Sequence, residues 1–274
     1  MPITSRDNPK IKQARSLRQR KQREATGLFL VEGIRHVGEA VEAAAPKAGK
    51  TSIEYIVYSP DLLTSVYAFE LIHREARANT PCYAVNAEVF ASLAEKENPQ
   101  GILAVVRQQP WSLAELNPLN FPWACALVAP QDPGNTGAIL RTIDAVKASG
   151  LILLDSSADP YHPSTVRASM GALFWYPVVC TSFSSFSGWA RSHSYQIYGT
   201  SAHGSVDYRQ IEQYPRPAIL LMGSEREGLS QEQSAVCDAL IRLPMEGRVS
   251  SLNLAVAAGI MLYEMYTKQG ETGL

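Results

Sequence analysis

Short apolar runs alternate with longer amphipathic stretches over the first part of the chain. The short runs predict strands, and the stretches with apolar residues at helical spacing predict helices. The expected strands cover residues 28–32, 53–58, 82–85 and 102–106. The expected helices cover residues 33–45, 61–77 and 86–94. This alternation is typical of a small α/β domain.

A further helix is expected before the first of these strands. Asn8 offers a capping amide, and Pro9 takes the first helical position, where its missing N–H has no intrahelical partner to lose. The polar run that follows extends to Arg23. We therefore predict that this helix continues through the whole N-terminal segment.

The second half of the chain repeats the α/β pattern over a greater length. Its expected strands lie near residues 124–128, 151–154, 178–180, 196–200, 218–222 and 239–243. The short connections and intervening helices predict a mostly parallel sheet with helices on both faces. The last helix, 251–266, is almost wholly apolar and rich in small residues, which favours burial in a core or at a subunit interface.

The two patterns are separated by a stretch without periodicity. Residues 107–122 hold three prolines, so we predict a linker there. The expected domains are therefore residues 1–106 and 123–274. A chain of 274 residues is long enough for two such domains, each with its own core.

Composition limits where the protein works. No apolar run approaches the roughly 20 residues that cross a bilayer, and the N-terminus lacks the apolar stretch of a secretory signal. The four cysteines lie far apart, with no C-x-x-C pair and no histidine at ligand spacing. We expect a cytoplasmic protein with reduced, mostly buried cysteines and no metal site.

Charge is distributed unevenly along the chain. Residues 1–23 hold eight basic side chains and one acidic one, although the whole chain has a net charge of −1. Such a segment on an otherwise acidic chain is typical of a protein that binds a polyanion. A solvated helix face explains the charge equally well. A mitochondrial transit peptide is a third reading, although too few apolar residues are present for a good amphipathic face.

Three loops of the second half each follow an expected strand, where open α/β sheets build ligand sites. They span residues 130–141, 220–230 and 243–259. Gly223 and Gly228 have the spacing of a phosphate loop, but Leu229 stands where that loop needs a lysine. No two glycines are two positions apart, which disfavours a Rossmann dinucleotide site as well.

The residues of these loops carry a resemblance to a known family. Asn135-Thr-Gly-Ala-Ile-Leu-Arg141, Gly223-Ser-Glu-Arg-Glu-Gly-Leu-Ser230 and Pro244-Met-Glu-Gly-Arg-Val-Ser-Ser-Leu-Asn253 resemble, in order, the three motifs of SpoU (TrmH-like) RNA ribose 2′-O-methyltransferases of the SPOUT superfamily. The match spans most of residues 124–267. Phe29-Leu-Val-Glu-Gly33 resembles the ribosomal-protein-like domain that binds substrate in many members.

The resemblance implies a trefoil-knotted methyltransferase domain that holds S-adenosylmethionine, a smaller N-terminal α/β substrate-binding domain, and a homodimer. It implies structured RNA as substrate, with rRNA favoured over tRNA. The implied donor contacts are Gly223, Leu243, Met245 and Leu252. The implied catalytic group is Arg141, supported by Asn135, Glu225, Ser251 and Asn253. The expected RNA contacts are Arg6, Lys10, Arg15, Arg18 and Arg167.

Arg141 is often assigned as the base in this family, yet an arginine is hard to deprotonate in a protein. We therefore expect Arg141 to clamp a substrate phosphate and stabilise the developing alkoxide, with Glu225 orienting it. Relatives commonly read Ser-Leu-Asn-Val-Ser where this chain has Ser251-Leu-Asn-Leu-Ala255, so one hydroxyl is lost. The alternative from another functional class is a catalytically silent RNA-binding protein that keeps the fold.

Overall fold

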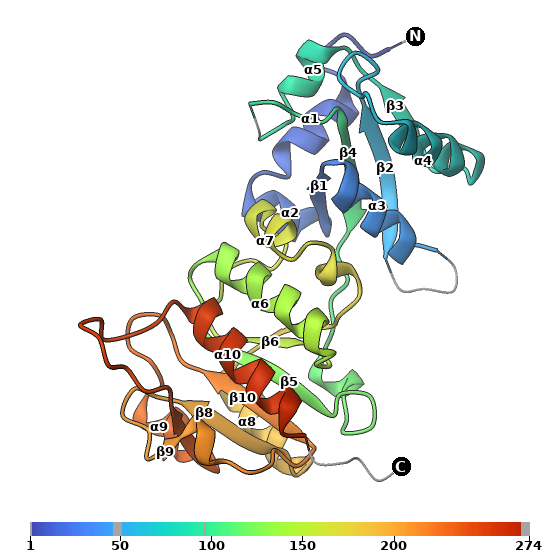
Figure 1. Ribbon diagram of the computed structural model, residues 1–274. Coiled ribbons are helices and arrows are strands. Elements are labelled where there is room, and N and C mark those ends of the chain that lie inside the picture. Colours follow the sequence, from blue (N-terminus) through green and yellow to red (C-terminus); the bar gives the residue numbers. More distant parts are fainter. Residues whose placement is uncertain (1, 46–50, 96, 270–274) are drawn as a thin grey trace. The chain divides into compact units, whose positions relative to one another are not determined.

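The computed structural model describes residues 2–45, 51–95 and 97–269 (Figure 1). Contacts between residues divide the chain into two compact units. The first unit consists of residues up to 109 together with residues 161–175, and the second unit consists of residues 110–160 and everything from 176 on. The segment 161–175 therefore leaves the range in which we expected the methyltransferase domain and packs with the N-terminal part of the chain.

The first unit is built on a four-stranded mixed sheet. Its strands are β1 (Leu28–Glu32), β2 (Ser52–Tyr58), β3 (Cys82–Ala84) and β4 (Ile102–Arg107), in the order β1-β4-β2-β3. The strand β4 is antiparallel to both β1 and β2, and β2 is parallel to β3. Its helices are α1 (Pro9–Ser16), α2 (Arg20–Thr26), α3 (Ile34–Ala43), α4 (Val66–Arg77), α5 (Ala87–Ala91) and α7 (Pro163–Ala168), followed by the short turn η2 (Ala172–Phe174).

Both faces of this sheet are covered. One core joins apolar side chains of α1 and α5 to alternate residues of the strands, among them Leu28, Leu30 and Tyr55. Because neighbouring strand residues point to opposite faces, Phe29 faces the other way. Its ring contacts those of Tyr161 and Phe174 at centroid distances of 4.8 and 6.3 Å. The segment 161–175 thus completes the second face of the first unit.

The single helix predicted through Arg23 is wrong, because the chain forms two helices here. The predicted start is confirmed, since the Asn8 side chain accepts a hydrogen bond from Lys10 N. The helix α1 ends at Ser16, and Gln19 is extended before α2 begins. Arg23 is only 1% exposed, and its guanidinium donates to the carbonyls of Leu17 and Arg18 at 2.8 Å. This basic residue therefore caps α1 from within the fold.

The second unit is built on a seven-stranded sheet. Its strands are β5 (Trp123–Val128), β6 (Leu151–Leu154), β7 (Val178–Thr181), β8 (Gln196–Thr200), β9 (Val206–Asp207), β10 (Ala218–Met222) and β11 (Ala239–Arg242). Their order is β7-β6-β5-β10-β8-β11-β9, and every described pairing is parallel, which confirms the predicted sheet. The helices are α6 (Pro133–Val146), α8 (Phe183–Ser192), α9 (Gln231–Ala235) and α10 (Leu254–Thr267), with short turns η1 (Leu113–Glu115) and η3 (Tyr208–Gln210).

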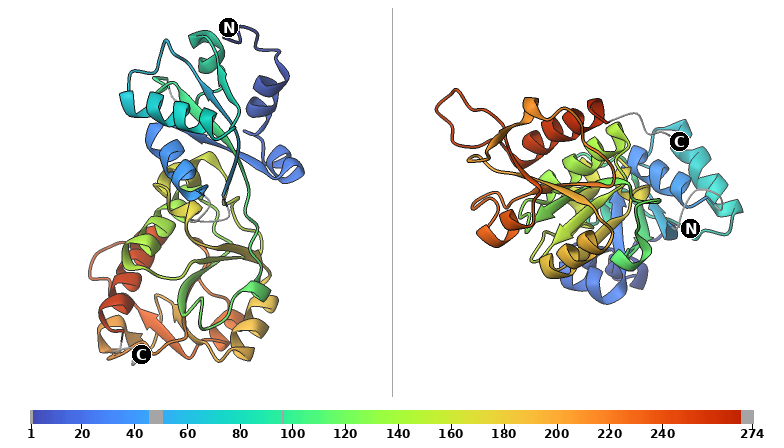
Figure 2. Two further views of the ribbon diagram at one scale, coloured as in Figure 1. Left: turned by 90° about the vertical axis from the view of Figure 1, so that its right-hand side faces the viewer. Right: turned by 90° about the horizontal axis from the view of Figure 1, so that it is seen from below.

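Helices cover both faces of the second sheet, as predicted. The helices α6 and α10 lie side by side on one face, and α8 lies on the other (Figure 2). Phe183, Phe186 and Trp189 of α8 pack against alternate residues of the central strands. In this order β10 lies between β5 and β8, and β11 follows β8. The loops after these four strands therefore meet at one edge of the sheet, because parallel strands end on the same side.

The segment predicted as a linker is largely packed into the second unit. Trp111 pairs with Val179 beside β7, and the side chains of Ser112 and Glu115 form a capping box around η1. Phe121 is fully buried in the core of the second unit. Of the four cysteines, Cys125 is buried, whereas Cys180 is exposed. Within the described ranges, no helix combines the length and the apolar character needed to span a membrane.

Candidate active site

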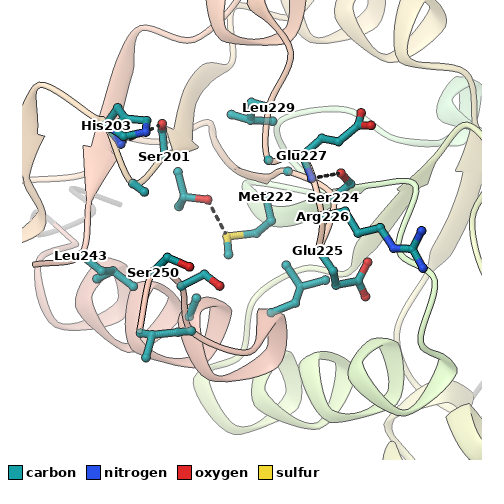
Figure 3. Close-up of a pocket in the computed structure, with 18 of the residues that line it drawn as sticks. Ser201, His203, Met222, Ser224, Glu225, Arg226, Glu227, Leu229, Leu243 and Ser250 are labelled. Atoms are coloured by element: carbon teal, nitrogen blue, oxygen red, sulfur yellow. Dashed lines mark hydrogen bonds between the residues drawn. The ribbon is translucent and has the colours of Figure 1, made fainter. Parts of the chain in front are cut away.

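A pocket of about 670 Å³ opens at the carboxyl ends of β8, β10 and β11 (Figure 3). All four residues expected to contact the donor line it: Gly223, Leu243, Met245 and Leu252. Glu225, Ser251 and Asn253 line it as well. The volume lies in the usual range for small-molecule sites, and the mix of leucine, methionine and small polar residues suits a purine nucleoside with a polar tail. The pocket therefore fits the expected donor.

The wall after β10 is a tight loop that requires glycine. Ser224 and Gly228 exchange two backbone hydrogen bonds, of 3.1 and 3.0 Å, and Gly228 has a φ of +70°. Gly223 is buried beneath this turn, where an added Cβ would lie 2.1 Å from the carbonyl carbon of Gly228 and 2.4 Å from Leu229 N. Gly223 is thus required by the loop itself, whatever the loop binds.

The side chain of Glu225 points out of this loop and is hydrogen-bonded to the loop after β5. Its carboxylate accepts hydrogen bonds from the backbone N–H groups of Gln131 at 3.1 Å and Asp132 at 3.4 Å. It also accepts a bond from the side-chain amide of Asn135 at 3.4 Å. Asp132 caps α6, and Asn135 lies buried in the first turn of that helix. The network fixes the start of α6 against the wall of the pocket.

Asn253 joins the same network from the third loop. Its amide donates to Asn135 Oδ1 at 3.0 Å, while its own carbonyl oxygen caps α10 by accepting from Ala255 N at 2.9 Å. The backbone of Ala255, the residue that departs from the family pattern, is thus used in the cap. The three motifs thus meet through Asn135, Glu225 and Asn253, although Glu225 and Asn253 lie 90 and 118 positions from Asn135.

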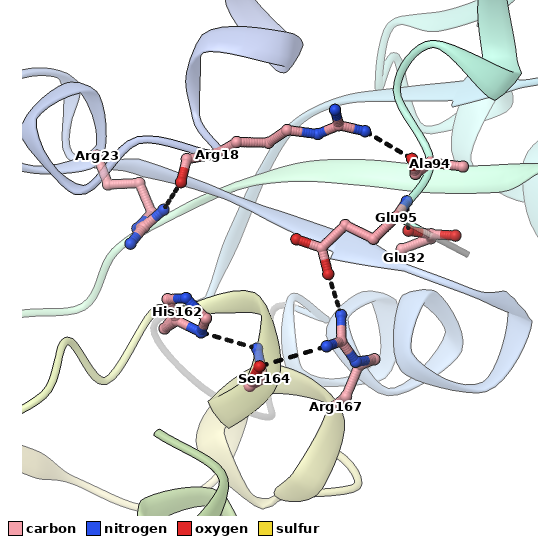
Figure 4. A network of polar contacts seen from close by, with 8 residues as sticks. All are labelled: Arg18, Arg23, Glu32, Ala94, Glu95, His162, Ser164 and Arg167. Carbon is pink, nitrogen blue, oxygen red and sulfur yellow. Dashed lines mark hydrogen bonds and ion pairs between the residues drawn. The ribbon is translucent and has the colours of Figure 1, made fainter. Parts of the chain in front are cut away.

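The structure does not place Arg141 in the lining of the pocket. Arg141 is exposed on α6, six residues beyond Asn135, a rise of about 9 Å along the helix. Arg167 lies on α7 in the first unit, where it forms an ion pair with Glu95 and donates to Ser164 Oγ (Figure 4). Four of the five expected catalytic residues therefore line the pocket or bond to its wall, and the fifth lies outside.

The expected RNA contacts of the N-terminal segment already have protein partners. Arg6 pairs with Glu88 at 2.9 Å, and Lys10 lies over the ring of Tyr55 at 4.9 Å. Arg15 donates to Ser92 Oγ, and Arg18 donates to the carbonyl of Ala94 (Figure 4). These contacts fix the side chains on the surface, and Arg6 and Arg18 remain exposed.

Sequence reasoning missed the pocket wall that follows β8. Thr200, Ser201 and His203 line the pocket. Figure 3 shows Ser201 and His203 on the side opposite Glu225. The Thr200 hydroxyl donates to the sulfur of Met222 at 3.3 Å, and Ser201 Oγ accepts from the backbone N–H of His203 at 3.2 Å. The sequence did contain a signal for this wall. These small polar residues come directly after an expected strand, as the residues of the other three loops do.

Other chemistry near the pocket is limited. In the part of the chain that the structure describes, no group of three His, Cys, Asp or Glu residues is placed to hold a metal ion. Burial raises the pKa of Cys237 to about 11, so this thiol behind the β10 loop stays protonated at neutral pH. Hydrogen bonds from Arg209 lower the pKa of Asp207 to about 2, so this pair stays ionised at the edge of the sheet.

Comparisons with known proteins show the family to which the chain belongs. Residues 123–263 match the SpoU rRNA Methylase family, and residues 8–104 match the MRM3-like substrate binding domain. A 23S rRNA (uridine(2479)-2′-O)-methyltransferase of Streptomyces viridochromogenes is 34% identical, over 96% of this chain and 90% of the relative. A 23S rRNA (guanosine(2553)-2′-O)-methyltransferase of Bacillus subtilis is 29% identical, over 96% and 98%.

Solved structures of rRNA methyltransferases are also similar to this chain. The crystal structure of an AdoMet-bound rRNA methyltransferase from Sinorhizobium meliloti has a TM-score of 0.86 and 35% identity, covering 97% of both chains. The fold and the site thus define an α/β methyltransferase with a pocket at the carboxyl edge of its sheet that fits the expected donor. The chain belongs to the SpoU rRNA methylase family. It is an S-adenosylmethionine-dependent RNA 2′-O-ribose methyltransferase, which confirms the resemblance read from the three motifs.

Proposed function

We propose that this protein methylates a ribose 2′-hydroxyl in structured rRNA, in preference to tRNA. The observation that carries this proposal is the network of Asn135, Glu225 and Asn253 at the wall of the pocket, in a chain whose relatives named above act on 23S rRNA. Mapping of ribose methylation by mass spectrometry, in cells with and without the gene, tests it. An unchanged rRNA with a changed tRNA would overturn the preference.

The residues have distinct roles in this proposal. When bound, S-adenosylmethionine supplies an activated methyl group, which leaves sulfur as the ribose oxygen attacks in line. Leu243, Met245 and Leu252 hold the donor, and the loop at Gly223 shapes the pocket wall. The start of α6 is positioned by Glu225, Asn135 and Asn253. Ser251 lines the pocket. Arg141 binds a substrate phosphate and stabilises charge on the oxygen, whose proton passes to phosphate or water.

Residues 1–106 serve as the RNA-binding domain in this proposal, residues 107–122 as the linker and residues 123–274 as the methyltransferase domain. The exposed basic side chains of α1 and its flanks contact the RNA backbone, with Arg167 as a further contact. Removing residues 1–23 would not test this cleanly, because Ile11, Ala14 and Leu17 are fully buried in the first core. Single substitutions on the surface are needed instead.

We expect Lys10→Gln to weaken RNA binding through charge alone. Each lost phosphate contact lowers the slope of log Kd against log salt by about 0.7 to 0.9. The matched control is Arg77→Gln, which removes an equal charge from the exposed C-terminal turn of α4. Filter binding of rRNA over a salt series measures both variants. Equal slopes for Lys10→Gln and wild type would mean that the basic segment is only a solvated face.

We also propose that the protein is a homodimer that uses α10. Val256, Ile260, Tyr263 and Tyr266 are 38–52% exposed along this helix. Apolar side chains at this spacing form one stripe, and an exposed stripe of this kind marks an interaction surface. The opposite side of α10 is buried against α6 and the sheet.

Ile260→Asp is expected to convert the dimer to monomers, because a carboxylate in the middle of the stripe would be buried without a partner. The control Lys147→Asp places the same acid on an exposed residue at the C-terminal end of α6. Sedimentation velocity at micromolar concentration distinguishes the two species. A wild-type protein that sediments as a monomer would contradict the proposed dimer.

Two further features belong to the proposal. The chain threads through a loop near residues 223–255 to form the trefoil knot of the SPOUT superfamily. This placement is supported by α10, which packs on α6 although it follows β11 across the sheet.

The protein works in the cytoplasm, where rRNA is modified. The silent-module alternative is not favoured, and measurable binding of S-adenosylmethionine by calorimetry separates it from an active enzyme.

A further inference from the structure

The loop after β10 carries a guanidinium that no motif assigned. Arg226 follows Glu225, lines the pocket and is exposed. Figure 3 shows its side chain leaving the loop on the same side as Glu225 and extending away from Met222 and Leu243. The guanidinium therefore points away from the side of the pocket that Met222 and Leu243 form.

Several basic side chains of the second unit are held by the protein. Arg209 is paired with Asp207 at 2.8 Å. Lys268 is paired with Glu264 at 2.6 Å and also donates to two backbone carbonyls. Arg216 bonds to Gln269 and lies over the ring of Trp123. Arg226, by contrast, has neither an ion pair nor a hydrogen bond to any of the described residues.

The neighbouring carboxylates do not neutralise Arg226. Both oxygens of Glu225 accept hydrogen bonds from the loop after β5 and from Asn135. That network directs the Glu225 carboxylate toward α6. The Glu227 carboxylate is exposed, and among the described residues it forms no ion pair with Arg226. A planar cation with five donors is thus left available in the lining of the pocket.

Two kinds of anion come near the pocket during the reaction. One is the phosphate of the RNA backbone, and the other is the carboxylate of the donor. A ribose 2′-hydroxyl lies next to a phosphodiester in every RNA chain, and a guanidinium binds phosphate through two parallel hydrogen bonds. We propose that Arg226 binds a backbone phosphate beside the target ribose, an inference that rests on the proposed RNA substrate. Its direction away from Met222 and Leu243 favours phosphate over the donor carboxylate.

The test compares Arg226→Ala with Arg226→Lys and with Arg191→Ala. Arg191 is an exposed cation in the last turn of α8 and does not line the pocket, so its loss changes net charge equally. The measurements are Kd for S-adenosylmethionine by calorimetry, the salt slope of binding to 23S rRNA from cells lacking the protein, and kcat/KM for that RNA.

We expect Arg226→Ala to lower kcat/KM for RNA about 10- to 100-fold. Its salt slope falls by about 0.7, one phosphate contact, while donor Kd stays within about twofold of wild type. Arg226→Lys retains the salt slope, and Arg191→Ala matches wild type throughout. A weaker donor Kd with an unchanged salt slope would place the donor carboxylate on Arg226 and overturn the proposal. Wild-type values for Arg226→Ala would overturn it too.

The outcome is separable from that of the proposed function. If the wild-type protein fails to methylate rRNA, the proposed substrate is wrong, while the salt slope still decides whether Arg226 contacts a phosphate, because binding needs no turnover. If the wild-type protein methylates rRNA and Arg226→Ala does so equally well, only the inference about Arg226 fails.

Discussion

Arg141→Ala is expected to lower the rate of methyl transfer about 10²- to 10⁴-fold, while the affinity for S-adenosylmethionine stays nearly unchanged. Arg141 is exposed on α6 and does not line the pocket, so its loss removes no donor contact. It does remove the proposed phosphate clamp and the charge that stabilises the developing alkoxide. Calorimetry with the donor and transfer of a labelled methyl group to rRNA measure the two effects separately.

Arg141→Lys is the matched variant. It keeps the charge but loses the planar fork, so we expect only partial recovery of the rate. Lys147→Ala, on an exposed residue at the end of the same helix, controls for the loss of one cation and is expected to match wild type. Full activity in Arg141→Ala would exclude the proposed role, and weakened donor binding would mean that Arg141 reaches the donor.

Gly223→Val is expected to abolish donor binding, with an increase in Kd of more than about 100-fold. Because Gly223 is an implied donor contact, a branched side chain there would fill the space of the donor. The structure gives a stronger reason, because even a Cβ would lie 2.1 Å from the Gly228 carbonyl carbon. The backbone of the loop must move, and Ser224 and Glu225 move with it. Methyl transfer is therefore expected to disappear together with donor binding.

Gly247→Ala is the control for this second prediction. Gly247 lies in the loop between Met245 and Ser250, and an added Cβ would meet no atom within 4 Å. We expect this variant to bind the donor as wild type does. Circular dichroism checks that Gly223→Val keeps the secondary structure of wild type, which would make the loss of binding local. Normal donor affinity in Gly223→Val would contradict the assigned pocket.

Much of the local structure follows from the sequence because short-range rules decide it. Asn8 and Pro9 fix the start of α1, and the apolar runs mark the strands of both sheets. Short-range rules failed at Arg23, where a polar run looked like one continuous helix. The Arg23 guanidinium is buried beneath the end of α1, where it bonds to the carbonyls of Leu17 and Arg18 at 2.8 Å. Only the folded chain brings these groups together.

The site divides in the same way. The motifs could be recognised in the sequence because each places Gly, Asn, Ser or Glu shortly after an expected strand. The sequence could not show that Asn135 bonds to Glu225 and Asn253. These hydrogen bonds join residues 90 and 118 positions apart, and they require the sheet order β5-β10-β8. Nor did sequence spacing show that Arg141 lies outside the pocket.

The sequence by itself determined the family and the parallel sheet, because periodicity and motif order are properties of neighbouring residues. The tertiary structure alone decided which side chains are available. It occupied Glu225 with the backbone of the loop after β5 and paired Arg167 with Glu95. It left Arg226 without a partner among the described residues. The physical reason is that charge and hydrogen bonding are satisfied through space, between residues that the chain order keeps far apart.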